Sequence, residues 1–531
     1  MEIKSRITTH RIAFWSGVLY ILAGVGCHIP EFLERSGLRS QPAGMPMMFM
    51  EFGMLLIVAG IGLAAYGLFP VHATQTNDGN VKFQLHALDN ARLGWAHWQL
   101  VAVLGIALVV DVMKPATIGF VVPGMRREYG ISTSEVSLLA FFAMIGTTVG
   151  SIVWGVLADR LGRRGSILLA ALIFVSTGIC GCMPAFKWNL VMCLFMGLSA
   201  GGLLPIVFAL LAEMVPARHR GWLSVLVGGL GSAGGYLAAS GAAAWLEPLY
   251  TWRILWLLNI PTGLLVVLLS RYIPESPRFL LQAGRVSEAQ KTLARFDVEL
   301  IRTNVTAAGE RAEHAFAFKQ LLRKPYALIT FTVCFYGMAW GLVNWGFLTW
   351  LPTILQDYLK MDDRIANRLL AEAALIAVPG CAIVAWLYGF WSSKRTMVFF
   401  ALATAIVLGG FSIFKPGDSQ AFFTALTVML LIGLSGMIAM LSPYSAELYP
   451  TRFRATGGGV AASSSKIGGV VGPSAVAIIM TVFPGLVIPA LSLAIPLLLA
   501  AIILWVNGKE TSGKRLEEIQ GAPVETAEVL E

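Results

Sequence analysis

Charged residues are scarce in this sequence of 531 residues: Asp, Glu, Lys and Arg make up 13% of it, whereas hydrophobic residues make up 56%. So little polar surface excludes a chain of soluble domains and predicts a protein that crosses a membrane many times. The net charge of +9 is then first a clue to topology, and we expect no nucleic-acid partner.

Cysteine is also rare, and the sites that catalysis would need are missing. The six cysteines form no CxxC pair and have no histidine at metal-ligand spacing, so we predict neither a disulfide framework nor a metal site. No GxxxxGK[ST] motif is present, which excludes ATP hydrolysis by a phosphate-binding loop. With no nucleophile–base pair either, we expect no cofactor and no enzymatic activity.

Long apolar runs are the dominant feature of the chain. About 30 Å of hydrocarbon needs roughly 20 apolar residues in a helix. On this criterion we predict 14 spans, at about 11–30, 46–70, 97–122, 134–157, 166–184, 189–213, 222–245, 252–273, 326–356, 366–391, 396–414, 420–446, 455–482 and 484–507.

The basic residues set the predicted orientation. Lys and Arg are far more numerous in the loops on the same side as the N-terminus, including 155–165 and 274–325, than in the loops on the other side. The positive-inside rule therefore places both termini in the cytoplasm, with the chain as a multi-pass protein of the cell inner (plasma) membrane.

The sequence carries an internal duplication. Glu213-Met-Val-Pro-Ala-Arg-His-Arg-Gly221 recurs as Glu447-Leu-Tyr-Pro-Thr-Arg-Phe-Arg-Ala455, and Gly162-Arg-Arg164 recurs in degenerate form as Ser393-Lys-Arg395. Two matches at nearly one offset indicate two six-helix halves. We therefore predict an all-α membrane protein with these domains: 1–95, two extra transmembrane helices and a cytoplasmic linker; 97–273, an N-terminal six-helix bundle; 274–325, a cytoplasmic loop with short helices at 287–295 and 307–322; 326–507, a C-terminal six-helix bundle; and 508–531, a cytoplasmic tail.

The stretch Gly155-Val-Leu-Ala-Asp-Arg-Leu-Gly-Arg-Arg-Gly165 packs four charges between two apolar spans, so it must be a tight loop at one membrane face. It resembles the loop signature of the major facilitator superfamily of transporters. Pro274-Glu-Ser-Pro-Arg-Phe-Leu-Leu281 and Glu510-Thr-Ser-Gly-Lys-Arg-Leu-Glu-Glu-Ile519 are similar to motifs of its sugar-porter branch, with the related aromatic-acid/proton symporters and organic ion transporters. The resemblance implies two pseudo-symmetric bundles that bind a small solute near the bilayer midplane and alternate its access.

Two charges lie in the third span, where an unpaired charge costs several kcal/mol. Asp111 and Lys114 are three residues apart, so they share a helix face and can pair. Asp111 is the leading candidate for proton binding, and the resemblance to aromatic-acid symporters supports an acidic residue here. Lys114 is a candidate substrate ligand, and the alternative is a self-neutralising pair that only orders the helix.

Lys466 lies in the middle of span 455–482, too far from either end to reach water easily. The resemblance to organic anion transporters favours contact with an anionic substrate; a pairing with Asp111 is the alternative. Aromatic and amide side chains of the ninth span either line a cavity or face lipid. The further candidates are Tyr336, Trp340, Asn344 and Tyr444 for substrate and Glu372 for a proton.

Charged residues at the span ends on the basic side are candidates for a cytoplasmic gate that opens and closes through ion pairs. They are Asp159, Arg160, Arg163, Glu213, Arg218, Arg220, Glu447, Arg452 and Arg454. Gly229-Leu-Gly-Ser-Ala-Gly234 matches a dinucleotide-binding pattern, but it lies inside a span without a preceding strand, so we expect close helix packing.

Taken together, the residues and the resemblance predict proton-coupled uptake (symport) of a small organic anion, such as an aromatic or other carboxylic acid. The partners are then the solute, a proton and the lipid bilayer. A proton-coupled sugar or polyol transporter, an organic-ion or drug exporter, and a non-transporting nutrient sensor remain alternatives. The sequence leaves the oligomeric state and the role of the first two spans open.

Overall fold

The computed structural model describes residues 2–37, 47–69, 82–84, 92–298, 301–303, 321–414, 419–449, 454–483 and 485–512. Within them the fold is helical, apart from one antiparallel pair of three-residue strands, β1 (Lys82–Gln84) and β2 (Ile301–Thr303). Fourteen helical segments of the described residues are long and apolar enough to span a membrane, which confirms the predicted fold class and its 14 spans. The second short helix predicted in the central loop, 307–322, lies almost entirely outside the described residues.

The helices up to the central loop are the following, in chain order: α1 (Glu2–Gly26), α2 (Ile29–Arg35), α3 (Met47–Leu68), α4 (Trp95–Tyr129), α5 (Thr133–Leu161), α6 (Arg163–Ser176), η1 (Thr177–Cys182), α7 (Phe186–Met214), α8 (Ala217–Tyr250), α9 (Ile254–Leu257), α10 (Asn259–Leu269), η2 (Ser270–Tyr272), α11 (Pro277–Gln282) and α12 (Val286–Ala294). Local signals fix several ends. The Ser132–Glu135 capping box opens α5, and Gly130 closes α4 in a left-handed conformation.

The second repeat contains α14 (Ala327–Thr353), η3 (Ile354–Tyr358), α15 (Asp363–Ala377), α16 (Gly380–Phe390), α17 (Ser393–Ile413), α18 (Gln420–Leu448), α19 (Arg454–Val482) and α20 (Val487–Asn507). By contacts the chain forms two compact units. Unit 1 comprises Met1–Arg220, Leu230–Ala307 and Thr349–Ala374; unit 2 comprises Gly221–Gly229, Ala308–Leu348 and Leu375–Glu531. The segment Thr349–Ala374 of the second repeat thus belongs to unit 1, and Gly221–Gly229 of the first belongs to unit 2.

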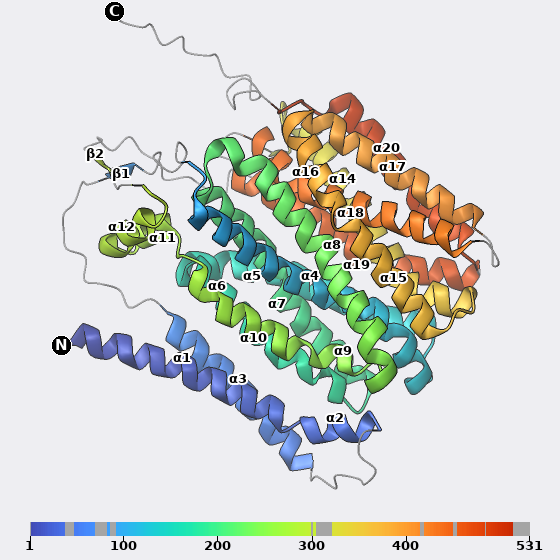
Figure 1. The fold of residues 1–531 in the computed structure, drawn as a ribbon, viewed down its shortest axis with the longest axis horizontal. Coiled ribbons are helices and arrows are strands. Elements are labelled where there is room, and N and C mark those ends of the chain that lie inside the picture. Colours follow the sequence, from blue (N-terminus) through green and yellow to red (C-terminus); the bar gives the residue numbers. More distant parts are fainter. Residues whose placement is uncertain are drawn as a thin grey trace, which may run out of the picture. The chain divides into compact units, whose positions relative to one another are not determined.

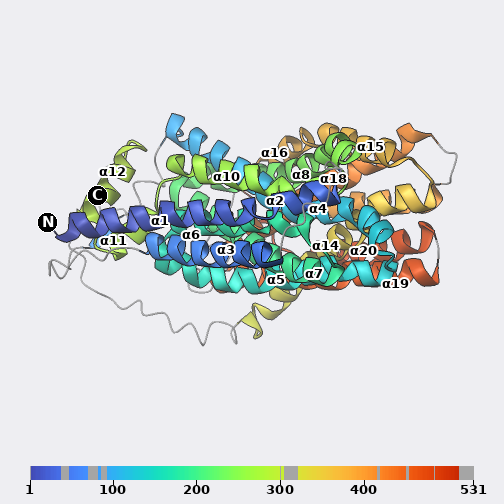
Figure 2. The same cartoon turned by 90° about the horizontal axis from the view of Figure 1, so that it is seen from below.

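The two extra helices α1 and α3 run side by side in unit 1 (Figures 1 and 2), and both contact α6. Glycines make the approach possible, because a Cβ atom at Gly17 would lie 2.6 Å from the Gly60 carbonyl oxygen. A Cβ atom at Gly24 would likewise lie 2.5 Å from the Gly53 carbonyl oxygen. Small residues at such spacing are how helices associate in lipid, where hydrophobicity gives no net attraction between them.

Close packing through small residues also builds the core of each unit. In unit 1, a Cβ atom at Gly197 of α7 would meet the carbonyl oxygen of Ala143 in α5 at 2.0 Å. In unit 2, Gly341 of α14 would meet the carbonyl oxygen of Ser465 in α19 at the same distance. Gly231 and Gly234, from the apparent dinucleotide motif, lie against Leu108 and Val109 of α4. Those glycines serve helix packing, as predicted.

Candidate transport site and gates

A buried ion pair lies in the middle of α4. Lys114 Nζ is 3.3 Å from Asp111 Oδ1 and donates to Ser199 Oγ of α7, also at 3.3 Å. The ammonium group also stands 3.7 Å from the ring centroid of Phe174 in α6. Both charged side chains are at most 5% exposed. The predicted pairing of Asp111 and Lys114 is therefore present in the structure.

The surroundings explain how this pair is tolerated. A charge at the centre of a bilayer costs on the order of 3 kcal/mol on insertion scales, and its counter-charge, hydroxyl and aromatic partners offset that cost. Removing one member would leave the other buried and uncompensated. The two buried charges therefore compensate each other within unit 1.

The aromatic candidates of the second repeat are buried, with their polar tips bonded to backbone. In unit 2, Tyr336 Oη donates to the Met397 carbonyl oxygen at 3.4 Å, and Trp340 Nε1 donates to that of Leu434 at 2.8 Å. Tyr444 Oη donates to the Lys509 carbonyl oxygen at 2.8 Å. In this conformation these three tips tie helices together, so a solute would have to exchange with backbone acceptors to reach them.

The remaining predicted ligands occupy different environments. Asn344 of α14 and Lys466 of α19 are both half-buried. Glu372 of α15 is 56% exposed and forms an ion pair with Arg368 at 2.8 Å. Glu372 is thus exposed and paired with a neighbour on its own helix, and its predicted role as a proton site stays a prediction.

The predicted gate of the first repeat contains an ion pair and a residue that the prediction missed. Arg163 Nη2 lies 3.7 Å from Glu213 Oε1, and the Ser276 hydroxyl donates to Glu213. Glu275, the missed residue, accepts hydrogen bonds from the backbone N–H groups of Arg163 at 2.6 Å and Arg164 at 3.3 Å. A carboxylate at the first turn of α6 satisfies unpaired donors and complements the helix dipole. We call this region of unit 1 the Glu275 end.

The other gate candidates lie in both units. Arg160 and Arg218 are exposed, and Arg220 Nη2 donates to the Val215 carbonyl oxygen at 3.2 Å. In unit 2, Tyr388 Oη donates to Glu447 Oε2 at 3.3 Å. Arg452 and the side chains of Asp159 and Arg454 lie outside the described residues, so their predicted roles stay predictions.

Unit 2 repeats the capping arrangement with a second carboxylate, Glu510. It accepts from the Ser393 backbone N–H at 3.0 Å and from the hydroxyls of Ser392 and Ser393 at the start of α17. Gly162 and Ser392 are the N-cap residues of α6 and α17, so they correspond, one residue earlier than the sequence match of Gly162 with Ser393. The motifs at 274–281 and 510–519 thus supply equivalent helix caps.

The pKa values of the two carboxylates shift in opposite directions. Burial raises the pKa of Glu275, although backbone donors of Ser276, Arg163 and Arg164 oppose the shift. At Glu510 burial also acts to raise the pKa, but the hydroxyls of Ser392 and Ser393 with nearby backbone donors outweigh it, and the pKa is lowered. The same cap therefore favours the neutral form in unit 1 and the charged form in unit 2.

Comparison with known proteins accounts for these repeated features. Residues 101–473 match the family model described as Major Facilitator Superfamily. The chain belongs to the Major Facilitator Superfamily. It is 27% identical over 445 residues to the niacin transporter NiaP of Acinetobacter baylyi, covering 81% of this chain and 98% of that protein. It is 26% identical over 433 residues to a gallate transporter of Pseudomonas putida, covering 79% and 94%.

Solved structures support the same fold. The chain aligns with the xylose transporter XylE from E. coli, in a partially occluded inward open conformation, with a TM-score of 0.65 and 17% identity, over 80% of this chain and 100% of that one. Like its family, this protein is a multi-pass membrane transporter and not an enzyme, which confirms those two predictions. Small organic solutes are the cargo named for the two sequence relatives.

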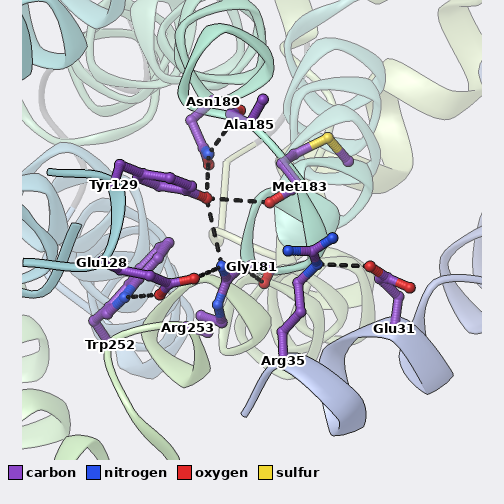
Figure 3. A network of polar contacts seen from close by, with 10 residues as sticks. All are labelled: Glu31, Arg35, Glu128, Tyr129, Gly181, Met183, Ala185, Asn189, Trp252 and Arg253. Carbon is purple, nitrogen blue, oxygen red and sulfur yellow. Dashed lines mark hydrogen bonds and ion pairs between the residues drawn. The ribbon is translucent and has the colours of Figure 1, made fainter. Parts of the chain in front are cut away.

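A second polar network lies in unit 1 of this facilitator protein, at the end opposite the Glu275 end (Figure 3). Arg253, fully buried, donates to Glu128 and, at 2.7 Å, to the Gly181 carbonyl oxygen. Trp252 Nε1 donates to the other Glu128 oxygen at 2.9 Å. Tyr129 Oη donates to the Met183 carbonyl oxygen at 3.1 Å. This network ties the end of α4 to η1, α7 and α9, and we call this region the Arg253 end.

Two ion pairs join the end of α4 to the segment that unit 1 takes from the second repeat. Arg126 pairs with Asp357 of η3, and Arg127 Nη2 lies 2.5 Å from Asp363 Oδ2 of α15. Exposed pairs of this kind contribute little stability each, at most about 1 kcal/mol.

Proposed function

We propose that this transporter is a proton-coupled symporter that takes up a small organic anion, an aromatic or other carboxylic acid, by alternating access. It lies in the cell inner (plasma) membrane with both termini in the cytoplasm. The observation that carries the proposal is the buried Asp111–Lys114 pair, because a carboxylate held against an ammonium group in a transport helix is a proton acceptor whose charge state moves its partner.

The coupling follows from charge balance. When Asp111 is ionised, its charge neutralises Lys114. When Asp111 takes a proton, the ammonium group of Lys114 loses its counter-charge and an anionic solute can replace it. Proton and anion would then bind together, which makes the pair of bound species electrically neutral while it crosses the membrane.

The relatives support the substrate class. Niacin and gallate, named for two of them, are both aromatic carboxylic acids. The basic loops at the Glu275 end support a cytoplasmic location for that end. A sugar or polyol remains the second candidate substrate, since the fold alone is shared with a xylose transporter.

Purified protein in proteoliposomes tests the coupling. Uptake of labelled benzoate-type acids driven by an imposed pH gradient, inside alkaline, should exceed uptake without the gradient. Asp111→Asn should abolish the gradient-driven part and largely spare exchange of solute for solute, because exchange needs no net proton release. Gradient-driven uptake by Asp111→Asn at the level of the unaltered protein would remove Asp111 from the mechanism.

Substitutions of Lys466 test the anion contact. Lys466→Ala should weaken binding of the acid by about ten- to hundredfold, since a charge-assisted contact contributes about 1.5–3 kcal/mol. Lys466→Arg keeps the charge and should weaken it less. Isothermal titration of the three proteins measures the affinities, and equal affinity in all three would mean that Lys466 does not contact the substrate.

A further inference from the structure

A cavity of about 490 Å³ lies at the Arg253 end, within unit 1. Its charged and polar lining includes Arg127, Glu128, Glu247, Asp362, Asp363 and Asn367. Glu247 is in the last turn of α8, and Asn367 is in the second turn of α15. The cavity therefore lies where α8 and α15 meet. The ion pairs of α4 with η3 and α15 lie at the same end.

Glu247 and Asn367 form the direct polar contact between these two helices. Asn367 Nδ2 donates to Glu247 Oε2 at 2.7 Å. Asn367 is only 1% exposed, and its Oδ1 atom is buried without a hydrogen-bond partner among the described residues. A buried acceptor left unpaired costs about 1–3 kcal/mol. The amide nitrogen of Asn367 therefore has an acceptor in Glu247, whereas its amide oxygen lacks a donor among the described residues.

A proton on Glu247 supplies the missing donor. A carboxylate can only accept, but a carboxylic acid has one O–H to donate. A neutral carboxylic acid beside an amide can form two hydrogen bonds, N–H to its carbonyl oxygen and O–H to the amide oxygen. Protonation would thus satisfy Asn367 Oδ1 while keeping the bond that is already present.

The charges that face Glu247 act in both directions. Asp363 of α15 interacts with it repulsively, and Arg127 of α4 attractively. Arg127 is itself paired with Asp363, so its charge is shared. Asp362 and Arg364 of α15 line the same cavity, and Glu128 of α4 is held by Arg253 and Trp252. An ionised Glu247 therefore stands in a cavity with three other carboxylates and two arginines.

We propose that Glu247 is a second proton-binding site and that its proton locks the Arg253 end closed through Asn367. Loss of the proton leaves Asn367 Oδ1 unpaired and adds a charge beside Asp363, so α8 and α15 separate. With this end facing outward, as the proposed function has it, low external pH closes the outward end and high external pH opens it. The lock rests on alternating access but not on Asp111.

Distance measurements by pulsed electron paramagnetic resonance test the lock. Spin labels go on Leu249→Cys of α8 and Ile365→Cys of α15, which are both exposed positions. The background carries Cys27→Ser and Cys334→Ser, the two cysteines that are not fully buried. In nanodiscs, the short-distance population of the full chain should grow as the pH falls. Glu247→Gln, which is always neutral and can donate to Asn367, should show the short distance at every pH.

Matched controls separate this lock from general charge effects and from the coupling step. Asp362→Asn removes another carboxylate of the same cavity and should keep the pH response, as should Asp111→Asn. Asn367→Leu should lose the response and favour the long distance. A pH response that persists in Glu247→Gln or in Asn367→Leu, or a distance in the unaltered protein that does not change with pH, would overturn the proposal. None of these outcomes bears on gradient-driven uptake, which tests the proposed function on its own.

Discussion

The first turns of α6 and α17 are each capped by a carboxylate from a distant part of the chain, but the groups that donate to the two carboxylates differ. In unit 1 the N-cap is Gly162 and the capping carboxylate is Glu275, which bonds to backbone N–H groups. In unit 2 the N-cap is Ser392 and the carboxylate is Glu510, which accepts from the hydroxyls of Ser392 and Ser393 in addition to backbone N–H groups. The two caps therefore share backbone donors, and the second adds side-chain hydroxyls.

The start of α6 also carries an ion pair. Arg163, the first residue of α6, both donates its N–H to Glu275 and pairs with Glu213. In unit 2 the corresponding carboxylate Glu447 contacts the neutral Tyr388 hydroxyl.

Replacing Gly162 by Ala should have the largest effect on this comparison. Its backbone (φ 87°, ψ 167°) is in a region that only glycine adopts readily, and a Cβ atom would lie 2.4 Å from Glu275 Oε2. We expect a loss of about 3 kcal/mol in the free energy of unfolding. Ser392→Ala is the matched change, has ordinary extended backbone, and should cost about 1 kcal/mol for the lost cap. Thermal unfolding of the purified proteins in detergent measures both, and equal losses would contradict the distinction.

The sequence predicted the helical fold, the 14 spans and the duplication because apolar length and motif repetition are local properties. It also placed Asp111 and Lys114 together, since a spacing of three residues fixes their common face. It missed Glu275 and Glu510, which act on helices more than 100 residues earlier in the chain. The motifs around them were recognised, yet only the packing of α6 and α17 shows what their carboxylates bond. Glu372 illustrates the reverse, because span membership alone does not tell an exposed face from a buried one.

Removing the carboxylates should have the next largest effect. Glu275→Ala leaves the N–H groups of Arg163 and Arg164 without their acceptor, and at about 1 kcal/mol per donor, the lower end of the usual range, the loss is about 2 kcal/mol. Glu510→Ala should cost less, because the Ser392 hydroxyl still caps the Arg395 N–H at 3.0 Å. Unfolding temperatures of the two variants, with Glu275→Gln as an acceptor-retaining control, test this order. A larger fall in unfolding temperature in Glu510→Ala than in Glu275→Ala would mean that the start of α17, and not that of α6, depends more on its carboxylate.

The pH dependence of stability gives the smallest and most specific contrast. Because the pKa of Glu510 is lowered in the folded protein, its contribution is present above the usual Glu value of 4.5 and is lost as the pH falls through the folded pKa. The pKa of Glu275 is raised, so its contribution is present below 4.5 and is lost as the pH rises through its folded pKa.

Neutral replacements expose the opposite signs. The stability of the unaltered protein relative to Glu510→Gln should rise as the pH increases toward 4.5 and then stay constant. Relative to Glu275→Gln it should fall as the pH increases above 4.5. Unfolding temperatures across the acid range measure both differences. Two differences of the same sign would mean that the two caps hold their carboxylates in the same charge state. The hydroxyl donors at Glu510, which Glu275 lacks, would then have no electrostatic consequence.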